Sequence, residues 1–385
     1  MPDLYRRDLL RLATTAPAWL LGGEAIAFSL LREQADGAWP HWQSFLDGFV
    51  QDDGRVIDWT DGGRTVSEGQ AYALFFALVA DDRAAFRRIL EWTRDNLAAG
   101  DLSSQLPAWL WGHDENTDRW GVLDANPASD ADLFIAYTLL EAGRLWRLAD
   151  HTATGRAMLR QVRERETVQR FGRQLLLPAP EGFTDDMSVR LNPSYIVPFQ
   201  MRFFAEHDPD GPWAGILAEH VRASADFLPN GLPPDWLMLV ADGYRPDETT
   251  GTRGSFDAIR CYLWSTMRVP GLDVVSPLRE RLARAQPMIR RRRAMPESWD
   301  VASAEMQGEG PPGFQLCAAA WLHDAGHETA AARFTERAET SLNGGLYGEP
   351  ARYYDQVLAL FANGWKQQRF RFAADGRLIP TWTSS

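Results

Sequence analysis

The sequence predicts an all-α fold in which a ring of buried helices is surrounded by a ring of amphipathic ones. Several helix-length segments are apolar on every side, which is typical of helices buried in a large core. Segments with a single apolar face alternate with them, and four of the apolar segments begin with a serine at nearly regular spacing. The chain has 385 residues, 45% of them hydrophobic, and is long enough to form a sizeable core.

The first apolar segment, SEGQAYALFFALVADD, begins at Ser67. Ser67 and Gln70 match a capping box, in which a serine accepts a hydrogen bond from the backbone N–H three residues on and the glutamine side chain reaches back. The segment is therefore predicted to be a buried helix with Glu68 in its first turn. A carboxyl group at the start of an otherwise apolar helix points to a special role.

Three later segments begin in the same way. The four serines are separated by 62, 65 and 61 residues, which fits one buried helix, one return helix and two connections in each repeat. Each of the three later serines is followed within two residues by a side chain that can take part in catalysis or binding. Asp130 follows Ser129, Tyr195 follows Ser194, and Asp257 follows Ser255.

Two further apolar segments, around Phe314 and Tyr354, bring the predicted buried helices to six. Such alternation with amphipathic helices predicts an α/α toroid in which all inner helices run in one direction. Their N-terminal ends, with the residues that follow each serine, then collect on one face. The six amphipathic segments are WPHWQSFLDGFV before Ser67 and the ranges 82–98, 152–164, 212–227, 277–290 and 328–339.

Glu68, Asp130 and Asp257 are thus predicted to converge at one rim. Hydrolysis of a glycosidic bond needs two such groups, because one carboxylic acid protonates the leaving oxygen and a second carboxylate acts as nucleophile or as base toward water. A carboxylate in the first turn of a helix can also simply compensate the helix dipole. Three of them on one face, at the start of apolar helices, favour the catalytic interpretation.

The two catalytic roles place opposite demands on the carboxyl groups. A helix N-terminus favours the ionised form, whereas a general acid must keep its proton near neutral pH. We therefore expect burial and neighbouring carboxylates to raise the pKa of Glu68. Arg260 lies one turn beyond Asp257 and, with the helix dipole, is expected to keep Asp257 charged. This asymmetry favours Glu68 as the acid and Asp257 as the base.

The composition excludes several other classes of function. The net charge is −12, from 40 basic and 52 acidic residues, and nucleic acid is therefore not expected as a partner. The two cysteines, Cys261 and Cys317, have no metal-ligand spacing, so neither a metal nor another cofactor is expected. They are interpreted as two buried thiols or as a disulfide.

Tryptophan is abundant, with 16 residues, and several of them lie in loop-like contexts. Such rings can fill a core, or they can line a groove with flat surfaces that have an apolar face and a polar edge. Sugar rings are natural partners for surfaces of that kind. The tryptophans in question are Trp59, Trp109, Trp111, Trp120 and Trp236.

The N-terminal segment has the features of an export signal. Arg6 and Arg7 precede a moderately apolar stretch that ends in Ala25-Ile26-Ala27, which fits a small-x-small cleavage rule. The arginine pair resembles a twin-arginine signal. Residues 1–27 are therefore predicted to be a signal and residues 28–385 a single domain, in a periplasmic or secreted protein. No other segment approaches 18 consecutive apolar residues, so no transmembrane span is predicted.

The motifs resemble those of glycoside hydrolase family 8, in particular the members encoded with bacterial cellulose synthase. The segment ASDADLFIAYTLLEAGRLW, from Ala128, is similar to the family signature, with Thr138 where a smaller residue is usual. SEGQAYALFFALVADDRAAF, LPAWLWG, RLNPSYIVP, SFDAIRCYLW and LFANGWKQQRFRF extend the similarity over residues from about 38 to 383.

This resemblance implies an (α/α)6 barrel, an inverting mechanism, no cofactor and cellulose or another β-1,4-glucan as substrate. It makes the cellulose synthase complex a candidate partner, and we expect a monomer. An inverting pair would place the carboxyl groups of Glu68 and Asp257 about 6.5–9.5 Å apart. Gly69 is expected to leave room for the glucan beside the acid.

The resemblance also implies a role for each residue at the rim. Glu68 matches the general acid and Asp257 the general base, while Asp130 matches the residue that holds and distorts the sugar at the cleavage point. Phe256 stands where relatives commonly have tyrosine, which puts one hydrogen bond near the base in doubt. The remaining matches are Tyr195 and Arg260, around the attacking water and the base, and Trp109, Trp111 and Tyr354, among the sugar contacts.

Two alternatives remain open from the sequence. The same fold could act on xylan, mixed-linkage glucan or chitosan. A non-catalytic glucan-binding or assembly factor is also conceivable, although such a protein need not retain Glu68, Asp130 and Asp257 together.

Overall fold

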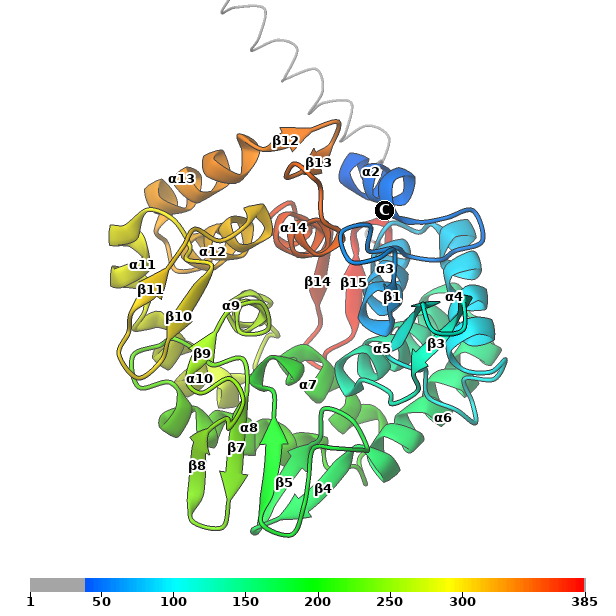
Figure 1. The fold of residues 1–385 in the computed structure, drawn as a ribbon, viewed down its shortest axis with the longest axis horizontal. Helices are drawn as coiled ribbons and strands as arrows, with labels where there is room; N and C mark the ends of the chain where they lie inside the picture. The colour runs from blue at the N-terminus through cyan, green and yellow to red at the C-terminus, as the bar shows by residue number, and fades with distance from the viewer. Residues whose placement is uncertain (1–38, 384–385) are drawn as a thin grey trace, which may run out of the picture. The chain divides into compact units, whose positions relative to one another are not determined.

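The computed structural model describes residues 39–383, and the export signal predicted for residues 1–27 lies outside the described residues. The chain from His41 onward forms one compact unit. Figure 1 shows this unit as a ring of helices, with one set of helices around the centre and a second set outside it.

The helices around the centre are buried over most of their surface, as their apolar sequences predict. In the helix that carries Glu68, twelve of 13 residues are buried, and in the next one 16 of 18 are. These inner helices are α3 (Ser67–Val79), α5 (Ser129–Trp146), α7 (Pro198–His207), α9 (Ile259–Thr266), α12 (Pro312–Asp324) and α14 (Tyr353–Lys366).

The outer helices bury one face each. The segment predicted as a single helix over 277–290 forms two helices, because Pro287 lacks a backbone N–H and can be accommodated only in the first turn of a new helix. The outer helices are α2 (Pro40–Phe49), α4 (Arg83–Leu97), α6 (Ala149–Arg165), α8 (Trp213–Phe227), α10 (Ser276–Ala283), α11 (Gln286–Arg292) and α13 (Glu328–Glu339).

Packing follows the chain around the ring. Helix α3 packs against α5 and α14, and α12 packs against α9 and α14, while α3, α5, α7 and α12 each pack against the outer helix that follows them. Aromatic rings fill the centre between these helices. Phe361 of α14 lies 4.5 Å from Phe76 and 5.8 Å from Phe134, measured between ring centroids. The centre of the ring is therefore a packed core.

The capping box predicted at the start of α3 is wrong. Val66 is the N-cap residue and provides no side-chain cap, and the hydroxyl of Ser67 has no hydrogen-bond partner in the part of the chain that the structure describes. Gln70 instead accepts from the backbone N–H of Val56 at 2.6 Å and donates to the hydroxyl of Thr93 at 2.9 Å. Its amide serves the packing of α3 against neighbouring segments.

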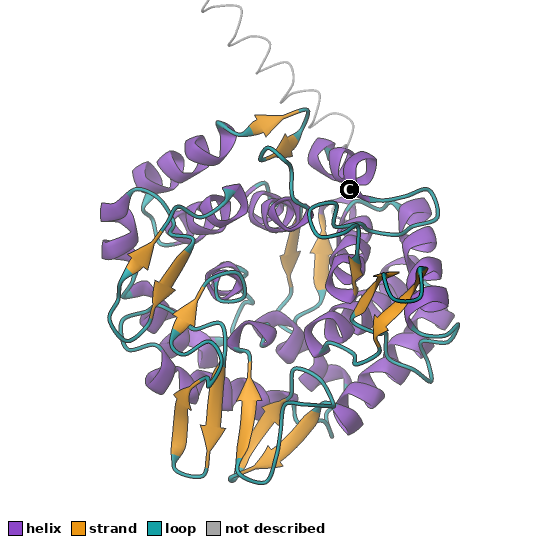
Figure 2. Cartoon of the chain, in the orientation of Figure 1, coloured by secondary structure: helices purple, strands orange, loops and turns teal. Residues whose placement is uncertain are grey.

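Short strands, which the sequence analysis did not identify, connect the helices (Figure 2). The three-stranded sheets are β1 (Thr65–Val66), β2 (Leu110–Asp114) and β3 (Arg119–Asp124); β6 (Ser188–Leu191), β7 (Leu237–Val240) and β8 (Gly243–Pro246); and β9 (Arg253–Gly254), β10 (Ser298–Asp300) and β11 (Met306–Gln307). The two-stranded sheets are β4 (Thr167–Arg170) with β5 (Arg173–Leu176), β12 (Leu342–Asn343) with β13 (Leu346–Tyr347), and β14 (Phe370–Phe372) with β15 (Leu378–Pro380). The 3-10 helices are η1 (Pro193–Tyr195), η2 (Asp273–Val275) and η3 (Thr381–Thr383).

Two of these strands directly position the predicted catalytic residues. Strand β1 ends at the residue before α3, and β9 ends three residues before Asp257. Cys261 and Cys317 are free thiols, so the disulfide is not formed; Cys317 is buried as expected, whereas Cys261 is half-buried. Within residues 39–383, none of the helices combines the length and the hydropathy that a membrane span requires.

Candidate active site

Glu68 lies in the first turn of α3, as predicted. The backbone N–H of Ser67 donates to the carbonyl of Trp109 at 2.9 Å, which fixes the start of the helix against the segment that leads into β2. The Oε2 atom of Glu68 is buried and has no hydrogen-bond partner among the described residues. Burial, followed by the nearby charge of Asp130, raises the pKa of Glu68 to about 8. This carboxyl group therefore holds its proton at neutral pH.

Asp130 occupies the first turn of α5 and is 2% exposed. Its Oδ1 atom accepts from the backbone N–H of Ala131 at 2.8 Å, and its Oδ2 atom accepts from Arg260 at 2.7 Å. Burial raises the pKa of Asp130, and the guanidinium of Arg260 opposes that rise.

Arg260, in α9, joins the predicted residues into one site. Its Nη1 atom donates to Oδ2 of Asp130 at 2.7 Å and to the hydroxyl of Tyr72 at 2.9 Å, and its Nη2 atom donates to Oδ1 of Asp257 at 2.7 Å. Its guanidinium also lies 5.4 Å from the ring centroid of Tyr195. One buried cation thus connects α3, α5, η1 and the segment before α9.

Asp257 is not in the first turn of a helix, because α9 begins two residues later. Its side chain is 30% exposed and accepts from Arg260. The segment that carries it wraps around Asp235, whose Oδ1 atom accepts from three backbone N–H groups, those of Ser255 at 2.8 Å, Asp257 at 3.1 Å and Ala258 at 2.8 Å. Burial and the charge of Asp257 raise the pKa of Asp235 to about 6. The sequence analysis missed Asp235, which follows two prolines and has no repeat spacing.

Two tyrosines complete the surroundings of Asp257. Tyr195 lies in η1, ahead of α7, and is 9% exposed. Tyr354, in the first turn of α14, donates its hydroxyl to the backbone carbonyl of Phe256 at 2.8 Å. Phe256 packs against Phe314, with ring centroids 5.0 Å apart. Tyr354 therefore supports the segment of the predicted base.

Trp109, Trp111 and Gly69, which were expected to contact a glucan or to leave room for it, also make contacts within the protein. Trp109 contributes backbone hydrogen bonds that hold the start of α3. Trp111, in β2, already packs against Arg55 and against the rings of Trp120 and Trp92. A Cβ added at Gly69 would meet the side chains of Val56, Tyr353 and Val66 at 3.5–3.8 Å, which are ordinary van der Waals distances, so this position faces neighbouring protein.

A second buried carboxyl pair lies behind the site. Asp132, in α5, and Glu166, at the end of α6, are both 0% exposed, and among the described residues neither carboxyl group has a hydrogen-bond partner. Their charged forms are therefore costly to bury. Burial raises the pKa of Asp132 well above its ordinary value and that of Glu166 to about 8.

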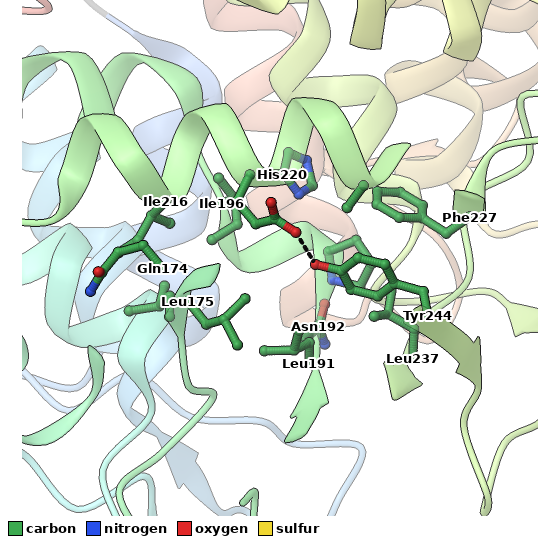
Figure 3. Close-up of a pocket in the computed structure, with 14 residues that line it drawn as sticks. Gln174, Leu175, Leu191, Asn192, Ile196, Ile216, His220, Phe227, Leu237 and Tyr244 are labelled. Carbon is green, nitrogen blue, oxygen red and sulfur yellow. Dashed lines mark hydrogen bonds between the residues drawn. The ribbon is translucent and has the colours of Figure 1, made fainter. Parts of the chain in front are cut away.

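The small cavity shown in Figure 3 does not coincide with the site formed by Glu68, Asp130 and Asp257. Within residues 39–383, no group of three or more histidines, cysteines and carboxylates is placed to hold a metal ion. The cavity in Figure 3, about 40 Å³, lies between α8, β5 and β7 and is lined mainly by aliphatic side chains, with the hydroxyl of Tyr244 donating to Glu219 at 2.7 Å. None of the predicted catalytic residues lines it.

A protonated buried carboxylic acid near a second, more accessible carboxylate is the kind of pair that hydrolysis of a glycosidic bond requires. The chain belongs to the family described as glycosyl hydrolases family 8, whose model matches residues 23–368. This finding confirms the family resemblance identified in the sequence.

Individual relatives agree with the family. An endoglucanase of Xanthomonas axonopodis pv. citri (strain 306) is 41% identical over 387 residues, 98% of this chain and 98% of that one. The crystal structure of endo-1,4-D-glucanase from Vibrio fischeri ES114 covers 90% of this chain and 100% of its own, with a TM-score of 0.81 and 34% identity. A cold-adapted family 8 xylanase covers 90% of this chain and 93% of its own, with a TM-score of 0.60 at 16% identity, which shows a shared fold only.

Proposed function

We propose that the chain is an inverting endo-β-1,4-glucanase that hydrolyses cellulose or nascent β-1,4-glucan. The observation that carries the proposal is that Arg260 bonds to both Asp130 and Asp257, whose charges, together with burial, raise the pKa of Glu68 and keep it protonated at neutral pH. The ring of inner and outer helices supports the assignment of the fold as an (α/α)6 barrel, with residues 28–385 as a single catalytic domain.

In this mechanism Glu68 protonates the glycosidic oxygen as the bond to the leaving sugar breaks. Its raised pKa, about 8, means that the proton is present at neutral pH. Because Oε2 has no partner among the described residues, no hydrogen bond to that atom has to be broken before the proton is transferred.

Asp257 acts as the base that removes a proton from the attacking water. Its hydrogen bond with Arg260 and the three N–H groups gathered on Asp235 hold its segment in place. Asp130, oriented by Arg260, is proposed to hold and distort the sugar at the cleavage point, with Tyr195 near the attacking water. Trp109, Trp111 and Tyr354 are proposed as contacts for the neighbouring sugars.

The experiment that tests the reaction is an assay of the full chain on carboxymethylcellulose, together with Glu68→Gln. Wild type should release reducing ends, and Glu68→Gln should release almost none while still binding cello-oligosaccharides. Proton NMR of the first products should show the α-anomer, because an inverting enzyme reverses the configuration of a β-linkage. Full activity of Glu68→Gln, or a first product with the β-configuration, would contradict the proposal.

The cellular role is proposed from the N-terminal sequence and from the family. We propose that the chain is exported by residues 1–27 to the periplasm or the medium, acts as a monomer, and supports cellulose synthesis and export, with the synthase complex as a partner. N-terminal sequencing of the exported protein should begin after Ala27, and light scattering should give the mass of one chain.

Another glycan is the alternative that the fold itself favours, since a family 8 xylanase shares it. Reducing-sugar release from xylan, mixed-linkage glucan and chitosan, compared with carboxymethylcellulose, separates these substrates. Glucan binding without turnover at any pH would instead favour a non-catalytic assembly factor.

A further inference from the structure

The β2–β3 hairpin presents an exposed aromatic ring that has no part in the cleavage chemistry. Cross-strand pairing joins His113 with Trp120 and Trp111 with Val122, so these four side chains share one face of the hairpin. Trp120 is 52% exposed on that face, which is unusual for so large an apolar side chain.

Trp120 is nevertheless held rigidly. Its ring stacks on Trp111, with centroids 5.3 Å apart and planes inclined by 26°. The guanidinium of Arg55 lies 4.9 Å from the ring centroid of Trp120 and 4.2 Å from that of Trp111. Arg55 is itself 8% exposed and is fixed by hydrogen bonds to the hydroxyl of Thr65, at 2.8 Å, and to the carbonyl of Gly63. A ring fixed in advance loses little conformational entropy when it binds a ligand.

The surrounding contacts distinguish Trp120 from Trp111. Trp111 is packed by Arg55, Trp120 and the edge of Trp92, whose centroid is 5.4 Å away, so much of its ring is covered. Trp120 also packs against His113, whose ring centroid is 5.2 Å away, yet it is 52% exposed and keeps aromatic surface open to solvent. Trp111 supports Trp120 within the hairpin, and Trp120 is the more exposed of the two rings.

The position of the hairpin indicates which ligand that is. Strand β2 pairs with β1, where Thr65 lies opposite Trp111 and Val66 opposite Leu110, and the next residues of the chain are Ser67 and Glu68. Figure 1 shows β1 and β3 beside α3 and α4, in agreement with their contacts. The exposed ring is therefore two strands away, in the same sheet, from the strand that leads into the segment carrying the acid.

We propose that Trp120 is an outer binding site for the β-1,4-glucan chain, with the apolar face of a sugar ring stacked on its indole. This proposal rests on the proposed function. The site is engaged by chains long enough to extend from the cleavage point to the hairpin, so it favours polymer over short oligosaccharides. A flat aromatic ring with a fixed orientation matches the flat, apolar face of a glucose unit.

The test compares Trp120→Ala with Trp59→Ala. Trp59 is a matched control because it is 58% exposed and lies in the neighbouring turn, but its indole N–H donates to the carbonyl of Gly48 at 2.8 Å, on the side of α2. Trp120→Ala should raise KM for carboxymethylcellulose about two- to tenfold, as expected for the loss of one aromatic contact, with kcat unchanged. Trp120→Phe should restore most of the affinity.

Chain length provides the second readout. KM for cellotetraose should be the same in wild type, Trp120→Ala and Trp59→Ala, since a short chain bound at Glu68 does not extend to the hairpin. Equal KM values of Trp120→Ala and Trp59→Ala on carboxymethylcellulose would overturn the outer site while leaving the proposed function intact.

Binding without turnover separates the two proposals. In affinity electrophoresis through a gel containing carboxymethylcellulose, Glu68→Gln should be retarded, and the double variant with Trp120→Ala should be retarded less. Equal retardation overturns the outer site. Absence of hydrolysis by wild type overturns the proposed function, and absence of any retardation of Glu68→Gln overturns both. Unchanged circular dichroism and Tm of Trp120→Ala would show that the fold is intact.

Discussion

The two carboxyl groups assigned to catalysis lie in opposite environments within one site. At the start of α3, the Oε2 atom of Glu68 is buried and has no partner within residues 39–383, and burial raises the pKa of Glu68 to about 8. Before α9, Asp257 is 30% exposed, is hydrogen-bonded to Arg260 at 2.7 Å, and lies on a segment held by Asp235. Glu68 is kept protonated by burial, whereas Asp257 is held in place by Arg260 and by the hydrogen bonds that its segment makes to Asp235.

Two similar helix starts in this fold provide two carboxyl groups with different proposed catalytic roles. Both groups lie near the N-terminal end of an inner helix, so the helix dipole acts on both in the same sense. The difference arises from the neighbours, because Asp130 adds negative charge beside Glu68, whereas Arg260 bonds directly to Asp257. Environment, more than residue type, assigns the acid and the base.

The largest effects are expected when the proposed acid and the proposed base are replaced separately. Glu68→Gln and Asp257→Asn should each lower kcat on carboxymethylcellulose by about 10²–10⁴-fold, the usual contribution of a general acid or base. On a 2,4-dinitrophenyl cello-oligosaccharide, whose leaving group needs no protonation, Glu68→Gln should recover most of its activity and Asp257→Asn should not. The kcat values of the two variants on each of the two substrates measure this difference. Equal recovery of the two variants would refute the assignment of roles.

A smaller effect is expected at Asp235, which positions the base without touching the substrate. Asp235→Ala removes the acceptor of three N–H groups and should lower kcat about tenfold, roughly the worth of one hydrogen bond, with KM nearly unchanged.

Asp235→Asn, which keeps an acceptor oxygen, serves as the matched control and should recover much of the loss. A loss of kcat as large as that of Asp257→Asn, or a change confined to KM, would argue against a positioning role.

The smallest effect concerns the buried pair of Asp132 and Glu166. The pKa of Glu166 is raised from 4.5 to about 8 in the folded protein, so between these pH values the folded state holds a proton that the unfolded state has lost. Stability therefore falls as pH rises through this window. Glu166→Gln should reduce that fall, to which the raised pKa values of Asp132 and Glu68 also contribute, and should raise the free energy of unfolding at pH 8 by about 1–3 kcal/mol, as expected when a buried unsatisfied group is relieved.

Urea unfolding of wild type and Glu166→Gln at pH 5 and pH 8 measures the effect. Glu164→Gln, an exposed position on the same helix, is the control and should change neither value. If wild type and Glu166→Gln show the same loss of stability between the two pH values, the titration of Glu166 is not a determinant of stability.

The sequence was sufficient to predict several of the helices. Segments that are apolar on every side located α3, α5, α12 and α14, and the amphipathic range 328–339 coincides with α13. The spacing of the serines also placed Glu68, Asp130 and Asp257 together, and Arg260 contacts both aspartates in the structure.

What the sequence could not predict depends on contacts between distant segments. Gln70 resembles a capping residue locally, yet its partners are Val56 and Thr93. Asp235 gathers the N–H groups of a segment 20 and more residues away, and Asp132 meets Glu166 only after α5 and α6 have packed. The sequence on either side of each residue contains no signal that identifies such a distant partner.

The central claim, that Glu68 is held protonated at neutral pH by its surroundings, can be measured directly. In protein labelled with ¹³C at the carboxyl carbon of glutamate, the spectra of wild type and Glu68→Gln should differ by one resonance, which titrates near pH 8. A basic limb of kcat/KM near the same pH should accompany it. A Glu68 resonance that titrates at its ordinary value of 4.5, leaving the group ionised throughout the active range, would contradict the account.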